Sequence, residues 1–70
     1  MIDPRLAVIF EARLDWTQET DKEAKVLLYH RFQEELESFC KQEDVQISPG
    51  DFLHFTREAF RDWRRSQPGK

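Results

Sequence analysis

The last third of the sequence sorts its side chains by chemistry when it is read as a helix. From Ser48 to Arg65, one face carries Phe52, Phe55, Ala59, Phe60 and Trp63. The opposite face carries Arg57, Arg61, Arg64 and Arg65, with His54 beside them. Sorting of this kind is typical of a surface helix that packs one side on a small core. It favours a helical fold, and it gives the outer side of this segment a positive charge.

Three segments begin with the signals that start helices. Asp3 before Pro4 combines an N-cap with a proline at the first helical position, where the missing N–H costs nothing. Thr20 and Glu23 have the spacing of a capping box, and Ser48 is again followed by a proline. We therefore predict an all-α domain of three helices, over residues 4–16, 21–43 and 49–66.

The second of these helices has a clear core stripe and the first does not. Leu28, Phe32, Leu36 and Phe39 recur at four- and three-residue spacing in the second. In the first, apolar residues point in several directions, and periodicity alone leaves helix and strand open for residues 5–10. The Asp-Pro cap favours helix there, and such a helix is usually covered on more than one side.

The connection over residues 44–47 is short, which favours direct packing of the segments that it joins. Residues 21–43 and 49–66 are therefore expected to form an antiparallel hairpin, with the first helix packed across it. Residues 1–70 would form one small domain.

The short length of the chain predicts that its hydrophobic core alone gives marginal stability and that a disulfide, a metal or a partner chain adds to it. A chain of 70 residues buries a modest share of its surface, and Cys40 is the single cysteine, so an internal disulfide is excluded. The sequence also has no cluster of Cys and His residues of the kind that binds a structural zinc ion. A partner chain is the remaining source of stability, so we expect a homo-oligomer, a homodimer in the simplest case, or a complex.

Several classes of protein are disfavoured. No apolar run approaches the ~18 residues of a membrane span, the first residues lack the features of a signal peptide, and we expect a cytoplasmic protein. The chain has two glycines and no phosphate-binding loop. Neither His30 nor His54 has a neighbour placed to make a catalytic pair. We expect no enzyme, no cofactor and no metal.

Three aromatic residues are predicted to contact a partner: Phe10, Trp16 and Trp63. Tryptophan is enriched at the centres of protein interfaces, and the first helix has more apolar surface than a three-helix bundle covers. The alternative is that the two tryptophans close the two ends of a single core.

The four arginines allow two interpretations. They could bind phosphate or an acidic partner, because guanidinium groups bind such anions bidentately. They could instead be neutralised locally, with Glu58 pairing with Arg61 and Asp62 with Arg65.

Charge is divided along the chain. Residues 1–44 hold eleven acids and six bases, a net charge of −5, while residues 45–70 hold three acids and five bases, a net charge of +2. These observations predict a small protein–protein interaction module, either self-associating or an adaptor or regulator. The alternative is a nucleic-acid-associated regulator that docks through the four arginines.

Overall fold

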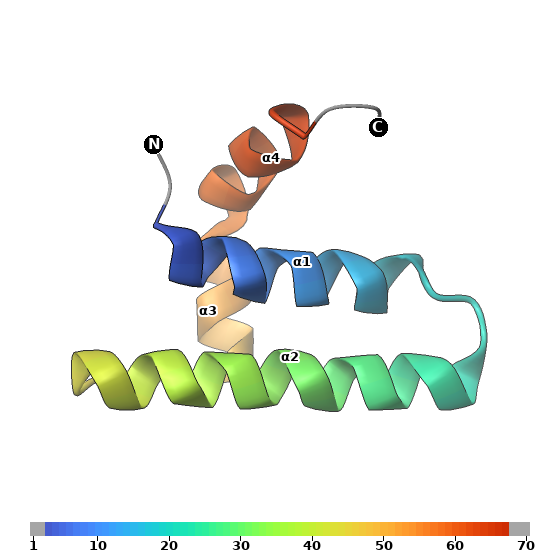
Figure 1. Cartoon of the computed structure of the whole chain (residues 1–70), viewed down its shortest axis with the longest axis horizontal. Helices are drawn as coiled ribbons and strands as arrows, with labels where there is room; N and C mark the ends of the chain where they lie inside the picture. Colours follow the sequence, from blue (N-terminus) through green and yellow to red (C-terminus); the bar gives the residue numbers. More distant parts are fainter. Residues whose placement is uncertain (1–2, 68–70) are drawn as a thin grey trace.

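The chain is all-helical in a computed structural model, which describes residues 3–67 (Figure 1). The helices are α1 (Pro4–Gln18), α2 (Lys22–Glu43), α3 (Pro49–Phe55) and α4 (Arg57–Arg65). The all-α prediction is confirmed. Residues 5–10, for which the sequence left helix and strand open, lie within α1 and are helical.

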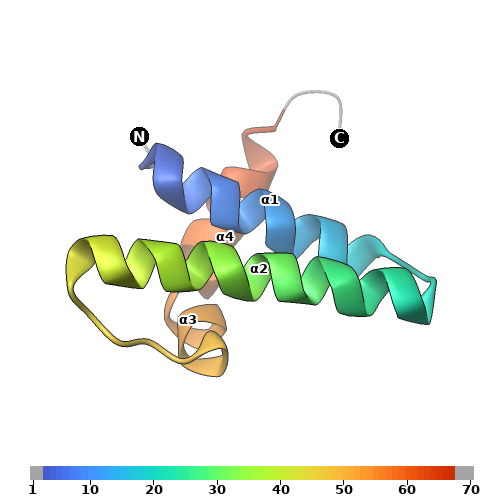
Figure 2. The same ribbon diagram turned by 60° about the horizontal axis from the view of Figure 1, so that its bottom comes forward.

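The antiparallel hairpin expected between residues 21–43 and 49–66 is not what the structure shows. α2 runs antiparallel to α1 instead, and α3 and α4 cross this pair on one side (Figures 1 and 2). The reason lies in α1, whose apolar residues point in several directions: α2 covers one side of it and α4 another. The ends of the pair are tied where Arg5 donates to Glu43 at 3.0 Å and to Gln42 at 3.2 Å.

The expected third helix is broken at Thr56. Its backbone has φ −102° and ψ 13°, and its hydroxyl donates to the carbonyl of Phe52. A threonine that bonds back to the fourth preceding carbonyl tends to bend a helix. The bend separates α3, which lies against the α1–α2 pair, from α4, which continues past α1 (Figure 1).

Aromatic rings form a continuous chain through the core. Trp16 stacks on Phe32 with ring centroids 5.7 Å apart, and Phe52 of α3 lies 6.1 Å from both Phe32 and Phe10. Phe10 then meets Trp63 of α4 at 5.8 Å. The remaining buried apolar residues are Ile9, Ala12, Leu14, Leu36 and Cys40. The rings therefore connect all four helices, which suits a chain short of aliphatic residues.

Side-chain caps begin the first three helices, close to where the sequence places them. Asp3 accepts from the backbone N–H of Arg5, and Ser48 accepts from that of Asp51. The cap of α2 is Asp21, one residue after the predicted Thr20. The hydrogen bond from the Arg5 side chain holds the pKa of Asp3 below its ordinary value.

Asp44 ends α2 in the left-handed region, with φ 55° and ψ 46°. Replacing Asp44 with glycine should stabilise the protein by about 0.5–1 kcal/mol, because glycine adopts this conformation without strain and removes an acid from the negative end of the helix. Urea unfolding checks this prediction. Alanine at the same position is the control and should destabilise; a more stable alanine variant would contradict the explanation.

Candidate interaction surface

Two of the three aromatic residues predicted to contact a partner are core residues. Phe10 is 0% exposed and Trp63 is 6% exposed within a single chain. Both are covered because α4 lies across α1, with Phe60 adding a ring 5.4 Å from Phe10. Neither residue offers a surface to a partner in this structure, which corrects the expectation for these two positions.

Trp16, the third, is half-buried and borders an open groove. One side of its ring packs on Tyr29, at 4.8 Å, and on Phe32. The groove lies between the end of α1, the start of α2 and α3, and its volume is about 540 Å³. It is lined by Trp16, Lys22, Lys25, Val26, Tyr29, Gly50 and Leu53. Its floor is therefore apolar, and both charged residues beside it are lysines.

The four arginines of the C-terminal segment are all exposed on α4. Among residues 3–67, the ion pairs within 4.0 Å join Arg5 to Asp3 and to Glu43, and Arg31 to Asp15. The local pairs expected from Glu58 to Arg61 and from Asp62 to Arg65 are not formed. Arg57, Arg61, Arg64 and Arg65, here called the basic face, thus keep their positive charge free within the described part of the chain.

Arg13 adds a partly buried cation on the neighbouring side of α1. Its guanidinium carbon lies 4.0 Å from the centre of the Phe60 ring, and burial lowers the pKa of the group. Its Nη1 atom is buried and has no hydrogen-bond partner among the described residues. The Phe60 ring compensates only part of the cost of removing this charge from water.

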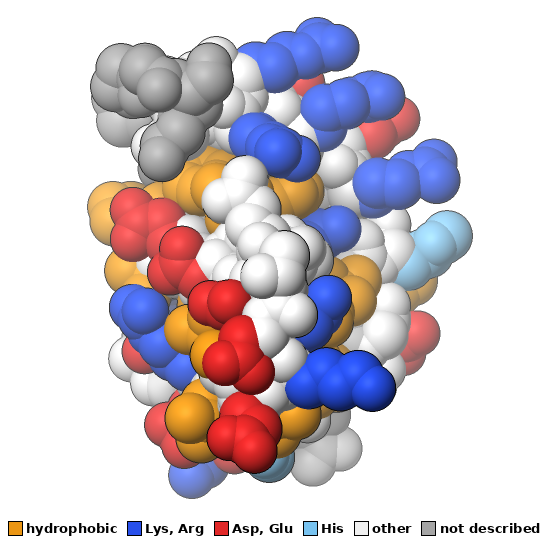
Figure 3. Space-filling model, turned by 90° about the vertical axis from the view of Figure 1, so that its right-hand side faces the viewer, with side chains coloured by type: hydrophobic (Ala, Val, Ile, Leu, Met, Phe, Trp, Pro, Cys, Tyr) orange, Lys and Arg blue, Asp and Glu red, His pale blue; other side chains and the backbone are white. Residues whose placement is uncertain are grey.

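Charges of opposite sign are separated on one face of the molecule. Seen from the end that carries the α1–α2 connection, most Lys and Arg side chains gather along one side and most Asp and Glu side chains along the other, with apolar atoms between them (Figure 3).

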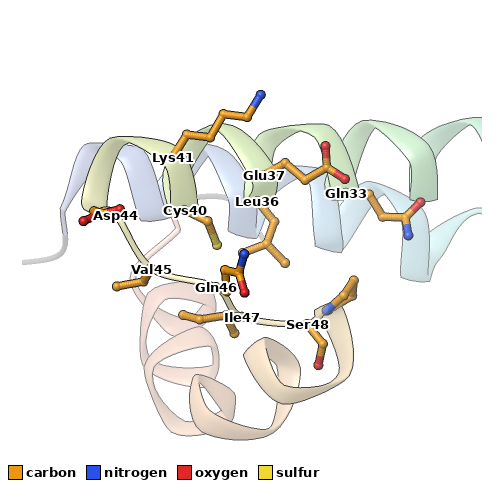
Figure 4. Close-up of a pocket in the computed structure, with 11 residues that line it drawn as sticks. Gln33, Leu36, Glu37, Cys40, Lys41, Asp44, Val45, Gln46, Ile47 and Ser48 are labelled. Atoms are coloured by element: carbon orange, nitrogen blue, oxygen red, sulfur yellow. The ribbon is translucent and has the colours of Figure 1, made fainter.

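A second hollow lies where the connection over residues 45–48 stands away from α2. The side chains of Leu36 and Cys40 point from α2 toward this connection, whereas Lys41 points away (Figure 4). Cys40 is buried, as expected for a small apolar residue. Polar side chains such as Gln33 and Glu37 also line this hollow.

Phe55 does not join the core, although the helical pattern places it on the apolar face. It is 78% exposed, while Phe52, three residues earlier, is buried. The side of α3 and α4 that faces the core carries Phe52 and Trp63, which are buried, and Phe60, which is partly buried, and Phe55 does not belong to it. The ring of Phe55 meets that of His54, at 5.3 Å.

The groove was not predicted from the sequence. Its residues come from α1, α2 and α3, and only the assembled fold brings them together. One signal was present: Val26 falls outside the core stripe of α2, and it is 55% exposed in the structure. An apolar residue off the stripe marks surface that the chain itself does not cover.

Comparisons of the chain with protein-family models, with curated proteins and with solved structures found no match. Within residues 3–67, no helix has both the length and the apolar character needed to cross a bilayer. Over the same residues, no three His, Cys, Asp or Glu side chains converge in a way that could hold a metal ion.

Proposed function

We propose that the protein is a small non-enzymatic interaction module that binds an acidic partner protein through its basic face. The observation that carries this proposal is that four exposed arginines on one nine-residue helix have no carboxylate within 4.0 Å among the described residues. Like charges at this spacing destabilise a helix slightly. A partner's carboxylates would remove that repulsion and accept bidentate hydrogen bonds.

A nucleic acid is the second candidate partner, since the same arginines could bind phosphates. A protein is favoured because the groove lined by Trp16, Val26 and Leu53 has an apolar floor, which suits side chains better than it suits phosphates.

The expected homodimer remains a proposal. It was based on a small core without a disulfide or metal, on an apolar first helix and on the division of charge along the chain; the single chain covers Phe10 and Trp63, two of the aromatic residues expected to contact a partner. The division of charge still supports contact between copies, because an acidic part of one copy would complement the basic face of another. Sedimentation at micromolar concentration decides between this and a monomeric adaptor.

The basic face should bind polyglutamate, a simple mimic of an acidic protein, more tightly than duplex DNA of equal charge. Replacing Arg57 and Arg61 together with glutamine should weaken polyglutamate binding about tenfold at low salt, because each exposed charge contributes up to ~1 kcal/mol. Isothermal titration at two salt concentrations measures both affinities.

A matched control removes two cations elsewhere. Arg31 and Lys41, both exposed on α2, are replaced with glutamine in one variant, which leaves the basic face intact. Equal losses in the two double variants would show that only net charge matters and would overturn the proposal. Tighter binding of DNA than of polyglutamate would favour the nucleic-acid alternative instead.

A further inference from the structure

We infer that the groove beside Trp16 binds an amphipathic acidic helix of the partner protein, whose apolar side chains enter the groove while its carboxylates face Lys22 and Lys25. This inference rests on the proposed function, because it assigns the partner's chemistry. It adds a second contact, on α1, α2 and α3, to the basic face on α4.

The groove is held open by the fold itself. Trp16 is fixed by its stacking on Phe32 and its contact with Tyr29, and both of those residues belong to α2. Leu53, on the opposite wall, packs partly against the core from α3. A site whose walls are already in place loses little conformational entropy on binding. The groove has a volume of about 540 Å³ and is wide open to solvent, so a partner segment would lie along it and would not be enclosed by it.

The charge around the groove selects the sign of its occupant. Lys22 and Lys25 are exposed at the groove and have no carboxylate within 4.0 Å among residues 3–67. The basic face lies on a different element, α4, which begins at Arg57. The two charged residues that line the apolar floor of the groove are both cations. An acidic segment is attracted to them, whereas a basic one is repelled.

The surroundings also select a helix. The described residues form helices only, so they offer no sheet edge to which an extended strand could add. A groove between helices accepts an amphipathic helix through apolar residues spaced three and four apart. The occupant is then a helix with leucine-like residues on one face and glutamates or aspartates beside them.

The test uses a designed glutamate–leucine peptide that is amphipathic over five turns, about 18 residues, and has no tryptophan. Its binding to the full chain is followed by isothermal titration and by the change in tryptophan emission. Trp63 is buried away from the groove, so Trp16 reports on the peptide. A peptide of the same composition in scrambled order and a lysine–leucine peptide should each bind at least tenfold more weakly.

Two substitutions test the groove without disturbing the core. Val26→Glu changes an exposed wall residue, and its matched control, Leu27→Glu, changes the next residue, which is 70% exposed and does not line the groove. Gly50→Glu adds an acid where a Cβ would meet no atom within 4 Å, in the first turn of α3, where an acid favours the helix. Val26→Glu and Gly50→Glu should each weaken peptide binding at least tenfold, and Leu27→Glu less than twofold.

The outcomes separate this inference from the proposed function. If Val26→Glu and Gly50→Glu leave peptide affinity unchanged while the Arg57/Arg61 variant loses polyglutamate binding, the groove inference is wrong and the module stands. Equal binding of the lysine–leucine peptide overturns the choice of an acidic occupant. If the wild-type chain sediments as a dimer and Val26→Glu is monomeric, the occupant is a second copy, and the inference of a separate partner's helix is overturned.

Discussion

Replacing Phe10 with alanine should unfold a large fraction of the protein in water. Phe10 is fully buried and contacts the rings of Phe52, Phe60 and Trp63, so its loss opens a cavity where α1, α3 and α4 meet. Truncating a buried phenylalanine to alanine costs about 3–5 kcal/mol. The core of a domain this small supplies roughly that amount in total. Residual folding should therefore be small.

Circular dichroism during urea and thermal unfolding measures this effect. Leu27→Ala is the control, because Leu27 is 70% exposed and its truncation should change stability by less than about 0.5 kcal/mol. A Phe10→Ala variant with the unfolding midpoint of the wild type would show that the ring chain through the core is not the main source of stability.

Replacing Trp63 with alanine should release α4 while the α1–α2 pair remains helical. Trp63 is the buried residue of α4, and it packs on Phe10 and, at 5.8 Å, on Phe60. The contacts between α1 and α2 do not involve α4, so they can hold when α4 is released. A helix of nine residues is too short to persist in water without such packing. The expected result is local unfolding of residues 57–65.

Hydrogen exchange resolved by residue distinguishes local from global loss. Amide protection should fall in α4 and change much less in α2. The neighbouring substitution Arg64→Ala removes an exposed side chain and should leave protection in α4 nearly intact. Uniform loss of protection across all four helices in Trp63→Ala would mean that α4 is required for the whole fold.

Helix starts were predictable from the sequence, and the pairing of helices was not. Asp3, Pro4, Ser48 and Pro49 act on the backbone next to them, so their effect can be read locally. An apolar stripe such as that of α2 shows which side is buried but not which helix buries it. The break at Thr56 was missed because it depends on one side-chain hydrogen bond within a segment that is otherwise helical in pattern.

For the candidate site, too, features that depend on neighbouring residues could be predicted and those that depend on the assembled fold could not. Exposure of the four arginines follows from helical periodicity and was predicted correctly. Whether Glu58 and Asp62 would pair with them depends on side-chain rotamers, which spacing does not determine. The groove joins Trp16, Val26 and Leu53 from three helices, so no local pattern contains it.

The arrangement of α1 and α2 has a consequence for the order in which the protein assembles. These helices are adjacent in the chain and joined by three residues, Glu19–Asp21, so the contacts next to this connection, such as that of Trp16 with Tyr29, are close in sequence and should form early. Phe52 and Trp63 emerge later from the ribosome, and until they arrive Phe10 and Phe32 are exposed to water. A nascent chain halted after Asp44 would therefore be a two-helix intermediate with an uncovered aromatic side, prone to aggregation and to chaperone binding.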